Sequence, residues 1–134
     1  MTMYLEDAIC EALETIEQLR GKVYPAEALK NATAPFIFYV QHNDDDREDL
    51  DGVTGLCSGL FEVDVVVNSY TQLLQLTKDV KSALRGMQGC MFGDLFIERV
   101  SVHAASPDLK EREVNLYRRM LELRINYQYE EVIQ

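Results

Sequence analysis

The sequence predicts an α+β fold in which about four strands form a mainly antiparallel sheet and two helices pack on one of its faces. Two segments carry apolar residues at helical spacing, while others alternate or concentrate them as strands do. Their order along the chain is helix, strand, strand, helix, strand, strand. The chain has 134 residues, of which 47% are hydrophobic. This is the size of one domain with one core, so we expect a single domain over 1–134.

The first helix is expected between residues 2 and 20. Apolar residues recur there every three or four positions, and acidic residues occupy much of the opposite face. Arg20 suits a helix C-terminus, and Gly21 can adopt the left-handed conformation that ends a helix. After an irregular stretch, Pro35 precedes the aromatic and β-branched run Phe36–Val40, which is typical of a strand.

The second strand and second helix have the clearest patterns in the sequence. Apolar and polar residues alternate over Leu60–Asn68, which predicts a strand with one fully apolar face. Ser69 follows as a helix N-cap, and Gln72 stands three residues later, as in a capping box. A helix is therefore expected over 69–85.

The remaining chain predicts a connector and two more strands. The glycine-rich stretch Gly86–Gly93 matches no phosphate-binding spacing and is interpreted as a flexible, hinge-like link. Strands are expected over 94–103 and 115–128, with a turn at Pro107 between them.

A long acidic loop is expected over about 43–59. Six acidic residues surround the single Arg47 there; they are Asp44, Asp45, Asp46, Glu48, Asp49 and Asp51. An EF-hand is excluded, because placing Gly52 at the required glycine position puts Arg47 at the first calcium ligand. A solvated, mobile loop is the favoured interpretation, and a looser divalent-cation site among its carboxylates stays open as an alternative.

The charge and the cysteines exclude several classes of protein. The formal net charge is −10, which argues against general binding to phosphate backbones, because that requires clustered Lys and Arg. Cys10, Cys57 and Cys90 form no CxxC pair and predict three reduced, partly buried thiols. No apolar run is long enough for a membrane span, and the acidic N-terminal segment is unlike a signal peptide. We therefore expect synthesis in a cytoplasm.

The search for chemistry finds no catalytic, metal or cofactor site. The sequence contains no GxSxG, Walker A or GxGxxG motif, and its two histidines, His42 and His103, lack further ligands at fixed spacing. Glu62 and Asp64 share one strand face and are interpreted as a solvent-facing or interface row, not as an acid–base pair. We expect a non-enzymatic protein, with a small hydrolase using either histidine as the alternative.

Five segments that span most of the chain form a recognisable series. In order they are Gly21–Pro25 (GKVYP), Ala34–Tyr39 (APFIFY), Phe61–Val65 (FEVDV), Ala83–Gly86 (ALRG) and Tyr117–Tyr127. With this series the chain resembles the tail-completion proteins of long-tailed bacteriophages, also called tail terminators or tail-to-head joining proteins. That family often has VYP after its first helix, a first long strand like APFIVY, a hydrophobic second strand, a helix ending like AL.G, and a closing strand of alternating polarity. The acidic loop is richer in Asp here than is usual for the family.

The resemblance implies a structural virion protein that forms a ring, as a homo-hexamer, on the end of the tail tube and joins the tail to the DNA-filled head. The implied partners are copies of the chain itself, the tail tube protein and a head-completion protein at the neck. Sequence-specific nucleic-acid binding and membrane binding are not expected. The alternatives are another neck, head-completion or minor tail component, or a regulatory or chaperone-like protein absent from the virion. The candidate interface residues lie in the expected loops; they are Asp44, Asp45, Asp46, Glu48, Asp49, Asp51, Gly89, Phe92, Asp108 and Lys110.

Overall fold

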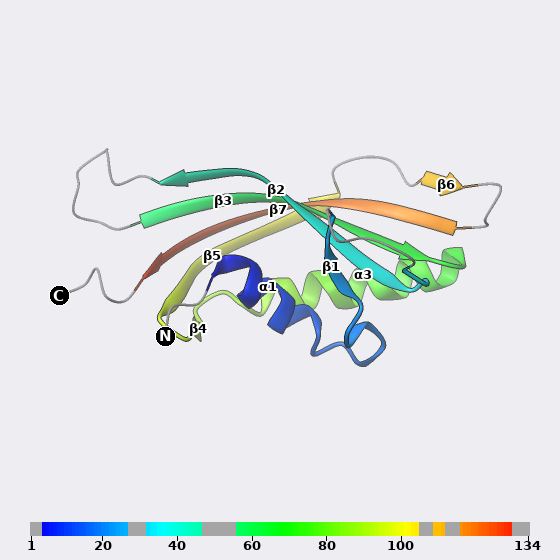
Figure 1. Cartoon of the computed structure of the whole chain (residues 1–134), viewed down its shortest axis with the longest axis horizontal. Helices are drawn as coiled ribbons and strands as arrows, with labels where there is room; N and C mark the ends of the chain where they lie inside the picture. Colours follow the sequence, from blue (N-terminus) through cyan, green and yellow to red (C-terminus); the bar gives the residue numbers. More distant parts are fainter. Residues whose placement is uncertain (1–3, 27–31, 47–55, 105–108, 112–115, 130–134) are drawn as a thin grey trace.

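The fold is one curved sheet with two helices on one side of it (Figure 1). The computed structural model describes residues 4–26, 32–46, 56–104, 109–111 and 116–129. The elements, in chain order, are α1 (Leu5–Leu13), the 3-10 helix η1 (Glu17–Leu19), β1 (Val23–Pro25), β2 (Phe36–Asp46), β3 (Leu56–Val67), α3 (Tyr70–Arg85), β4 (Met91–Phe92), β5 (Leu95–Ala104), β6 (Leu109–Glu111) and β7 (Leu116–Tyr129).

The sheet is larger than the sequence predicted, and its pairing is mixed. Its strands follow the order β1-β2-β3-β7-β5-β4, with β6 paired to β7 off this path. The prediction of about four mainly antiparallel strands is therefore wrong, although the class is α+β. β1 pairs parallel with β2. The added strands β1, β4 and β6 have only two or three residues each, which is too short for alternation to be visible in a sequence.

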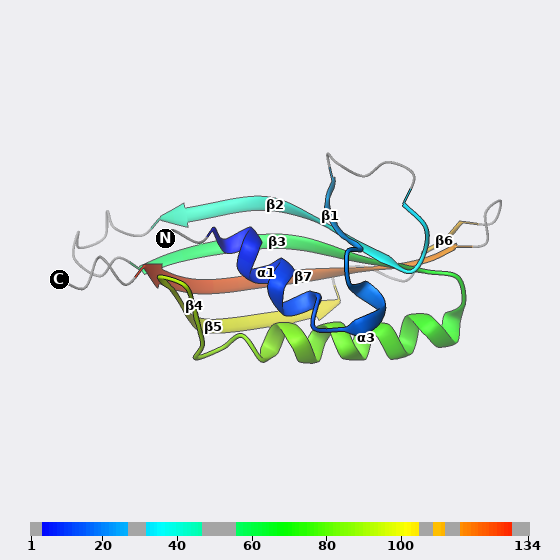
Figure 2. The same cartoon turned by 60° about the horizontal axis from the view of Figure 1, so that its bottom comes forward.

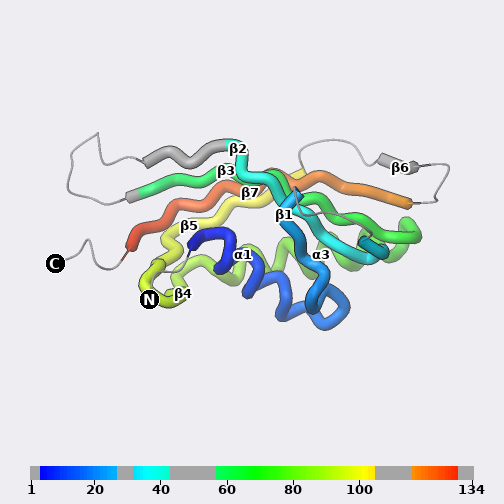
Figure 3. The backbone as a smooth tube through the Cα atoms, in the orientation of Figure 1, coloured from blue at the N-terminus to red at the C-terminus, as the bar shows by residue number. Residues whose placement is uncertain are grey.

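The four long strands β2, β3, β7 and β5 form the antiparallel centre of the sheet. The tube in Figure 3 shows them curving together along their length. Two register shifts occur, one between Gln41 and Asn43 in β2 and one between Ile97 and Arg99 in β5. Each shift inserts one residue and thereby exchanges the faces to which the following side chains point.

The first helix is shorter than expected. α1 ends at Leu13, with Glu14 as its C-cap, and η1 follows after a turn. This break lets Leu19 reach the core, where it is fully buried. The Glu14 carboxylate accepts a hydrogen bond from the backbone N–H of Gly21 at 2.7 Å, and Gly21 has a φ of 75°. The side chain that ends the helix thus also holds the glycine turn that leads into β1.

The second helix begins where the sequence predicted. The Ser69 hydroxyl accepts a hydrogen bond from the Gln72 backbone N–H at 3.2 Å. The Gln72 side chain accepts from the backbone N–H of Asn68 at 3.1 Å, one residue earlier than in a standard capping box. The two side chains therefore fix the passage from β3 into α3.

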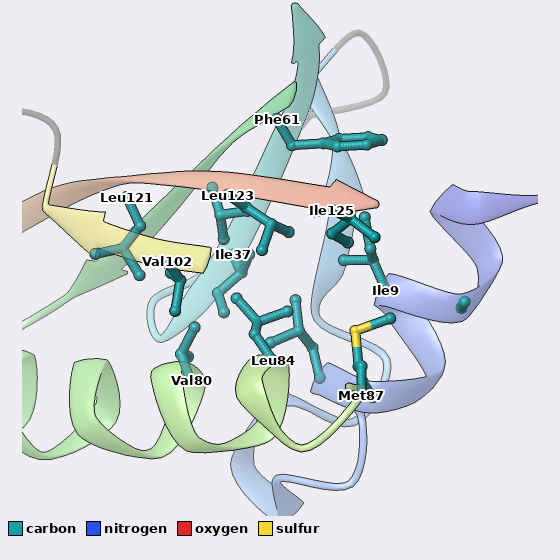
Figure 4. Packing of buried hydrophobic residues seen from close by; sticks show 14 of the residues in the cluster. Ile9, Ile37, Phe61, Val80, Leu84, Met87, Val102, Leu121, Leu123 and Ile125 are labelled. Carbon is teal, nitrogen blue, oxygen red and sulfur yellow. The ribbon is translucent and has the colours of Figure 1, made fainter. Parts of the chain in front are cut away.

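Both helices cover the same face of the sheet. Figure 2 shows α1 crossing the strands and α3 running beside β5. The inward side chains of β3, namely Phe61, Val63, Val65 and Val67, are fully buried, as are Leu121, Leu123 and Ile125 of β7. They meet the apolar side of α3, which buries Leu73, Leu76, Thr77, Val80 and Leu84. Figure 4 shows Val80 and Leu84 pointing from α3 toward the sheet, and Ile9 entering from α1.

The connector over 86–93 is ordered, so its interpretation as a flexible link is wrong. Met87 is 1% exposed, and the backbone N–H of Gly89 donates to the Ile97 carbonyl at 2.7 Å. The Ile97 N–H donates in return to the carbonyl of Cys90 at 2.9 Å. Burial and hydrogen bonding together fix this turn against the edge of β5.

Leu84→Ala should lower the free energy of unfolding by about 2–5 kcal/mol, because it leaves a cavity between α3 and the sheet. Leu74→Ala on the same helix is the matched control, since Leu74 is 47% exposed. It should change the free energy of unfolding by less than about 0.5 kcal/mol. Urea denaturation followed by circular dichroism measures both. Equal effects would show that α3 does not bury the face described.

Candidate functional site

Part of the predicted acidic loop lies in strands, and the rest lies outside the described residues. Asp44, Asp45 and Asp46 belong to β2, opposite Gly59, Ser58 and Cys57 of β3. The expected loop over 43–59 is therefore wrong at both of its ends, because β2 continues through Asp46 and β3 starts at Leu56. The other three acidic residues, Glu48, Asp49 and Asp51, lie outside the described residues.

The other candidate interface residues are not brought together at one place. Gly89 lies in the ordered turn after α3, and Phe92 in β4 packs against the core. Lys110 lies in β6, opposite Tyr117 of β7, while Asp108 lies outside the described residues. Figure 1 shows β4 and β6 at opposite ends of the sheet. The predicted candidates therefore mark two separate ends of the molecule.

A buried carboxyl group stands on the sheet face that the helices leave open. Asp64 of β3 is 0% exposed, between Phe38 of β2 and Met120 of β7 in the register. The Nε atom of Arg118 lies 3.3 Å from Asp64 Oδ2. The sequence predicted a solvent-facing or interface row for Glu62 and Asp64, and for Asp64 the solvent-facing alternative is wrong. Alternation shows which face a side chain takes, but not whether neighbouring side chains cover that face.

Burial and the neighbouring Glu62 carboxylate together raise the pKa of Asp64 to about 8, against the lowering effect of Arg118. A hydrogen bond from Asp64 lowers the pKa of Glu62. Although Arg118 Nε lies 3.3 Å from Oδ2, neither oxygen of the Asp64 carboxylate accepts a well-formed hydrogen bond within the described residues. Once protonated, it becomes a donor itself and can share its proton with Glu62. The pair therefore holds one proton at neutral pH.

Each histidine lies beside a glutamate on the outer face of the sheet. His42 Nε2 is 3.1 Å from Glu62 Oε1, and His103 Nε2 is 3.4 Å from Glu122 Oε1. His42, Glu62 and Glu122 also line one small depression with a volume of about 80 Å³. This is well below the roughly 300 Å³ at which ligand pockets usually begin. Among the described residues no group of three or more His, Cys, Asp or Glu is placed to hold a metal ion.

A larger groove runs along the helical side of the molecule. Two adjoining depressions, with volumes of about 650 and 210 Å³, share Thr15 and Ala83. Their lining includes the carboxylates Glu11, Glu17 and Asp79, and among the described residues no Lys or Arg contributes to it. Sequence reasoning missed this groove, because it arises from the packing of α1 and η1 against α3.

Exposed arginines occupy the outer face at the β5–β7 side. Arg99 pairs with Asn126 and Ser101 pairs with Arg124 in the register of these two strands, so the two arginines are diagonal neighbours. Both are exposed. Within the described residues, neither has an ion pair. Their face is opposite to the helices, because Val102 and Leu123, which alternate with them, are buried in the core.

No disulfide joins Cys10, Cys57 and Cys90. Cys10 and Cys57 are half-buried, and Cys90 is exposed, contrary to the expectation that all three are partly buried. Burial raises the pKa of the Cys10 thiol.

Comparison with known proteins finds a similar backbone path among solved structures, but no match to a protein family. No protein-family model matches the chain, and no curated protein does. Among the solved structures that match is a chain from "Virion of native gene transfer agent (GTA) particle", with a TM-score of 0.45 and 18% identity. The match covers 91% of this chain and 86% of that one. In the described part of the chain, no helix has the length and apolar character needed to cross a membrane.

Asp64→Asn should change how stability depends on pH. The pKa of Asp64 rises on folding from its ordinary value of 3.8 to about 8, so the protonated group stabilises the fold fully below about pH 4. This contribution is lost as the pH rises toward 8, by up to about 1.4 kcal/mol per pH unit. Asparagine stays neutral. The variant should therefore gain stability relative to the wild type as the pH rises from about 5 to about 9.

Urea denaturation across this pH range measures the difference, and a carbon-13 titration of the Asp64 carboxyl measures the pKa itself. Glu62→Gln is the matched control. It removes the neighbouring carboxylate and should lower the pKa of Asp64 without changing its burial. A constant difference in stability at every pH would contradict the shared proton.

Proposed function

We propose that this chain is a structural, non-enzymatic component of a phage-like virion. It forms a ring, hexameric in the favoured form, on the end of the tail tube and joins the tail to the DNA-filled head. Its partners are copies of itself, the tail tube protein and a head-completion protein at the neck. It acts in the virion, after synthesis in the host cytoplasm.

The proposal is carried by one observation on the segments that resemble tail-completion proteins. Val23, Tyr24 and Pro25 pair in register with Ile37, Phe38 and Tyr39, so VYP and the strand APFIFY form one parallel unit at the sheet edge. The Ile37 N–H also donates to the Lys22 carbonyl at 3.0 Å. Two motifs that are apart in the sequence are thus adjacent in space. The two segments that carry the start of the resemblance therefore form one structural unit.

The shape of the molecule supports a role in a ring. Its helical face carries the groove lined by Glu11, Glu17 and Asp79, whereas its outer sheet face exposes Arg99 and Arg124. A ring closes when one surface of a subunit meets a different surface of the next. The two ends are then available for different partners, such as a tail on one side and a head on the other.

Deleting the gene from the genome that encodes this chain tests the proposal. Particles should show tails of abnormal length, or full heads beside unattached tails, in negative-stain electron microscopy. Heads of normal form that leak their DNA would favour a head-completion protein instead. Mass spectrometry of purified particles is the companion measurement, and absence of the chain from them would contradict a virion role.

The double variant His42→Ala with His103→Ala separates a structural protein from a small hydrolase. Both imidazoles are more than half exposed, so the loss should cost little stability. Complementation of the gene deletion by this variant should restore infectivity to within about threefold of the wild type, as for exposed positions generally. Infectivity abolished in a variant that remains folded would favour histidine chemistry.

A further inference from the structure

We propose that copies of this chain associate head to tail, with the groove between α1 and α3 of one copy receiving Arg99 and Arg124 of the next. This inference rests on the proposed function, because it names the surfaces through which the ring closes.

The groove offers carboxylates without cations to neutralise them. Glu11 and Glu17 are exposed along α1 and η1, and Asp79 faces the same space from α3. Asp79 accepts one hydrogen bond, from the Gln75 side chain at 3.2 Å. In the ranges that the structure describes, none of the three forms an ion pair. Each therefore retains oxygen atoms that can accept hydrogen bonds from a partner.

The lining of the groove suits a long side chain with an apolar stem and a charged end. Its lining includes the small residues Ala12, Ala83 and Gly86 between the carboxylates. Ile16 and Phe92 add apolar surface to the lining. An arginine side chain fits such a lining, because its methylene stem packs on apolar atoms while its guanidinium pairs with carboxylates.

The arginine patch offers the complementary arrangement. Arg99 and Arg124 are diagonal neighbours on β5 and β7, at a separation of about 7–8 Å between their backbones. The strands hold both arginines on a rigid surface, so little backbone ordering is lost on binding. Two guanidinium groups at this spacing can each reach a carboxylate across a contact.

The two surfaces lie on opposite faces of the sheet, so they cannot meet within one molecule. Contact between them must join two copies, and a second copy supplies both halves of the charge pairing. A contact between unlike surfaces leaves a free groove at one end and a free patch at the other, so further copies can add until the ring closes.

Reversing the charges tests the pairing. One variant, Glu11→Lys with Asp79→Lys, makes the groove basic. A second, Arg99→Glu with Arg124→Glu, makes the patch acidic. Each variant alone should associate at least about tenfold more weakly than the wild type, because like charges then meet. An equimolar mixture of the two should recover association, since every contact between unlike copies is again complementary.

Sedimentation velocity and native mass spectrometry of the full chain, from micromolar to millimolar concentration at low salt, measure the association. Wild-type association should weaken as salt is added, because the charges are exposed. Lys78→Glu, an exposed change on α3 outside the groove lining, is the charge control and should associate like the wild type. Circular dichroism confirms that each variant is folded.

Three outcomes would overturn the inference: a wild type that stays monomeric at every concentration, reversal variants that still associate, or a mixture that does not recover. If the wild type is monomeric and the groove variant also fails to attach to tails, the groove binds a basic segment of another protein. The proposed function fails separately, if purified virions lack the chain.

Discussion

The pairing of β3 with β7 is the interaction on which the rest of the structure depends. β3 is paired to β7 along its whole length, from Leu56 to Val67. The inward side chains of both strands form the apolar surface against which the helices pack. Because side chains alternate along a strand, the burial of these residues also determines which side chains lie on the outer face. A slip of one residue would turn Glu62 and Asp64 toward the core and expose Val63 and Val65. The buried apolar row therefore fixes the position of the carboxyl pair.

The register shift in β5 determines which side chains of that strand lie on the outer face. Leu95 and Ile97 point inward, and simple alternation would then turn Arg99 and Ser101 into the core. The shift between Ile97 and Arg99 instead directs Val100 and Val102 inward and leaves Arg99 exposed. The inserted residue thus keeps the Arg99 guanidinium out of the core, where burial of an unpaired charge would be unfavourable, and places it on the outer face.

The sequence predicted the parts of this structure that repeat a local pattern over many residues. α3, with its Ser69 cap, and the alternation in β3 and β7 are of this kind. The short strands β1, β4 and β6 were missed, because their pairing is set by partners far along the chain. The burial of Asp64 and the groove beside Asp79 were missed for a related reason. Both depend on what neighbouring elements cover, which no local spacing records.

The outer face consequently divides into a covered half and an open half. On the side of β1 and β2, the rings of Tyr24 and Phe36 lie 6.3 Å apart, and Phe36, Val66 and Asp64 are each less than 10% exposed. The acidic group there avoids an uncompensated charge by keeping its proton. On the side of β5, Arg99 and Arg124 reach solvent. A partner that approaches the outer face in this region therefore meets cations, although the chain carries a net charge of −10. Among the described residues, the acidic groove on the helical side complements them in charge, as the proposed head-to-tail association requires.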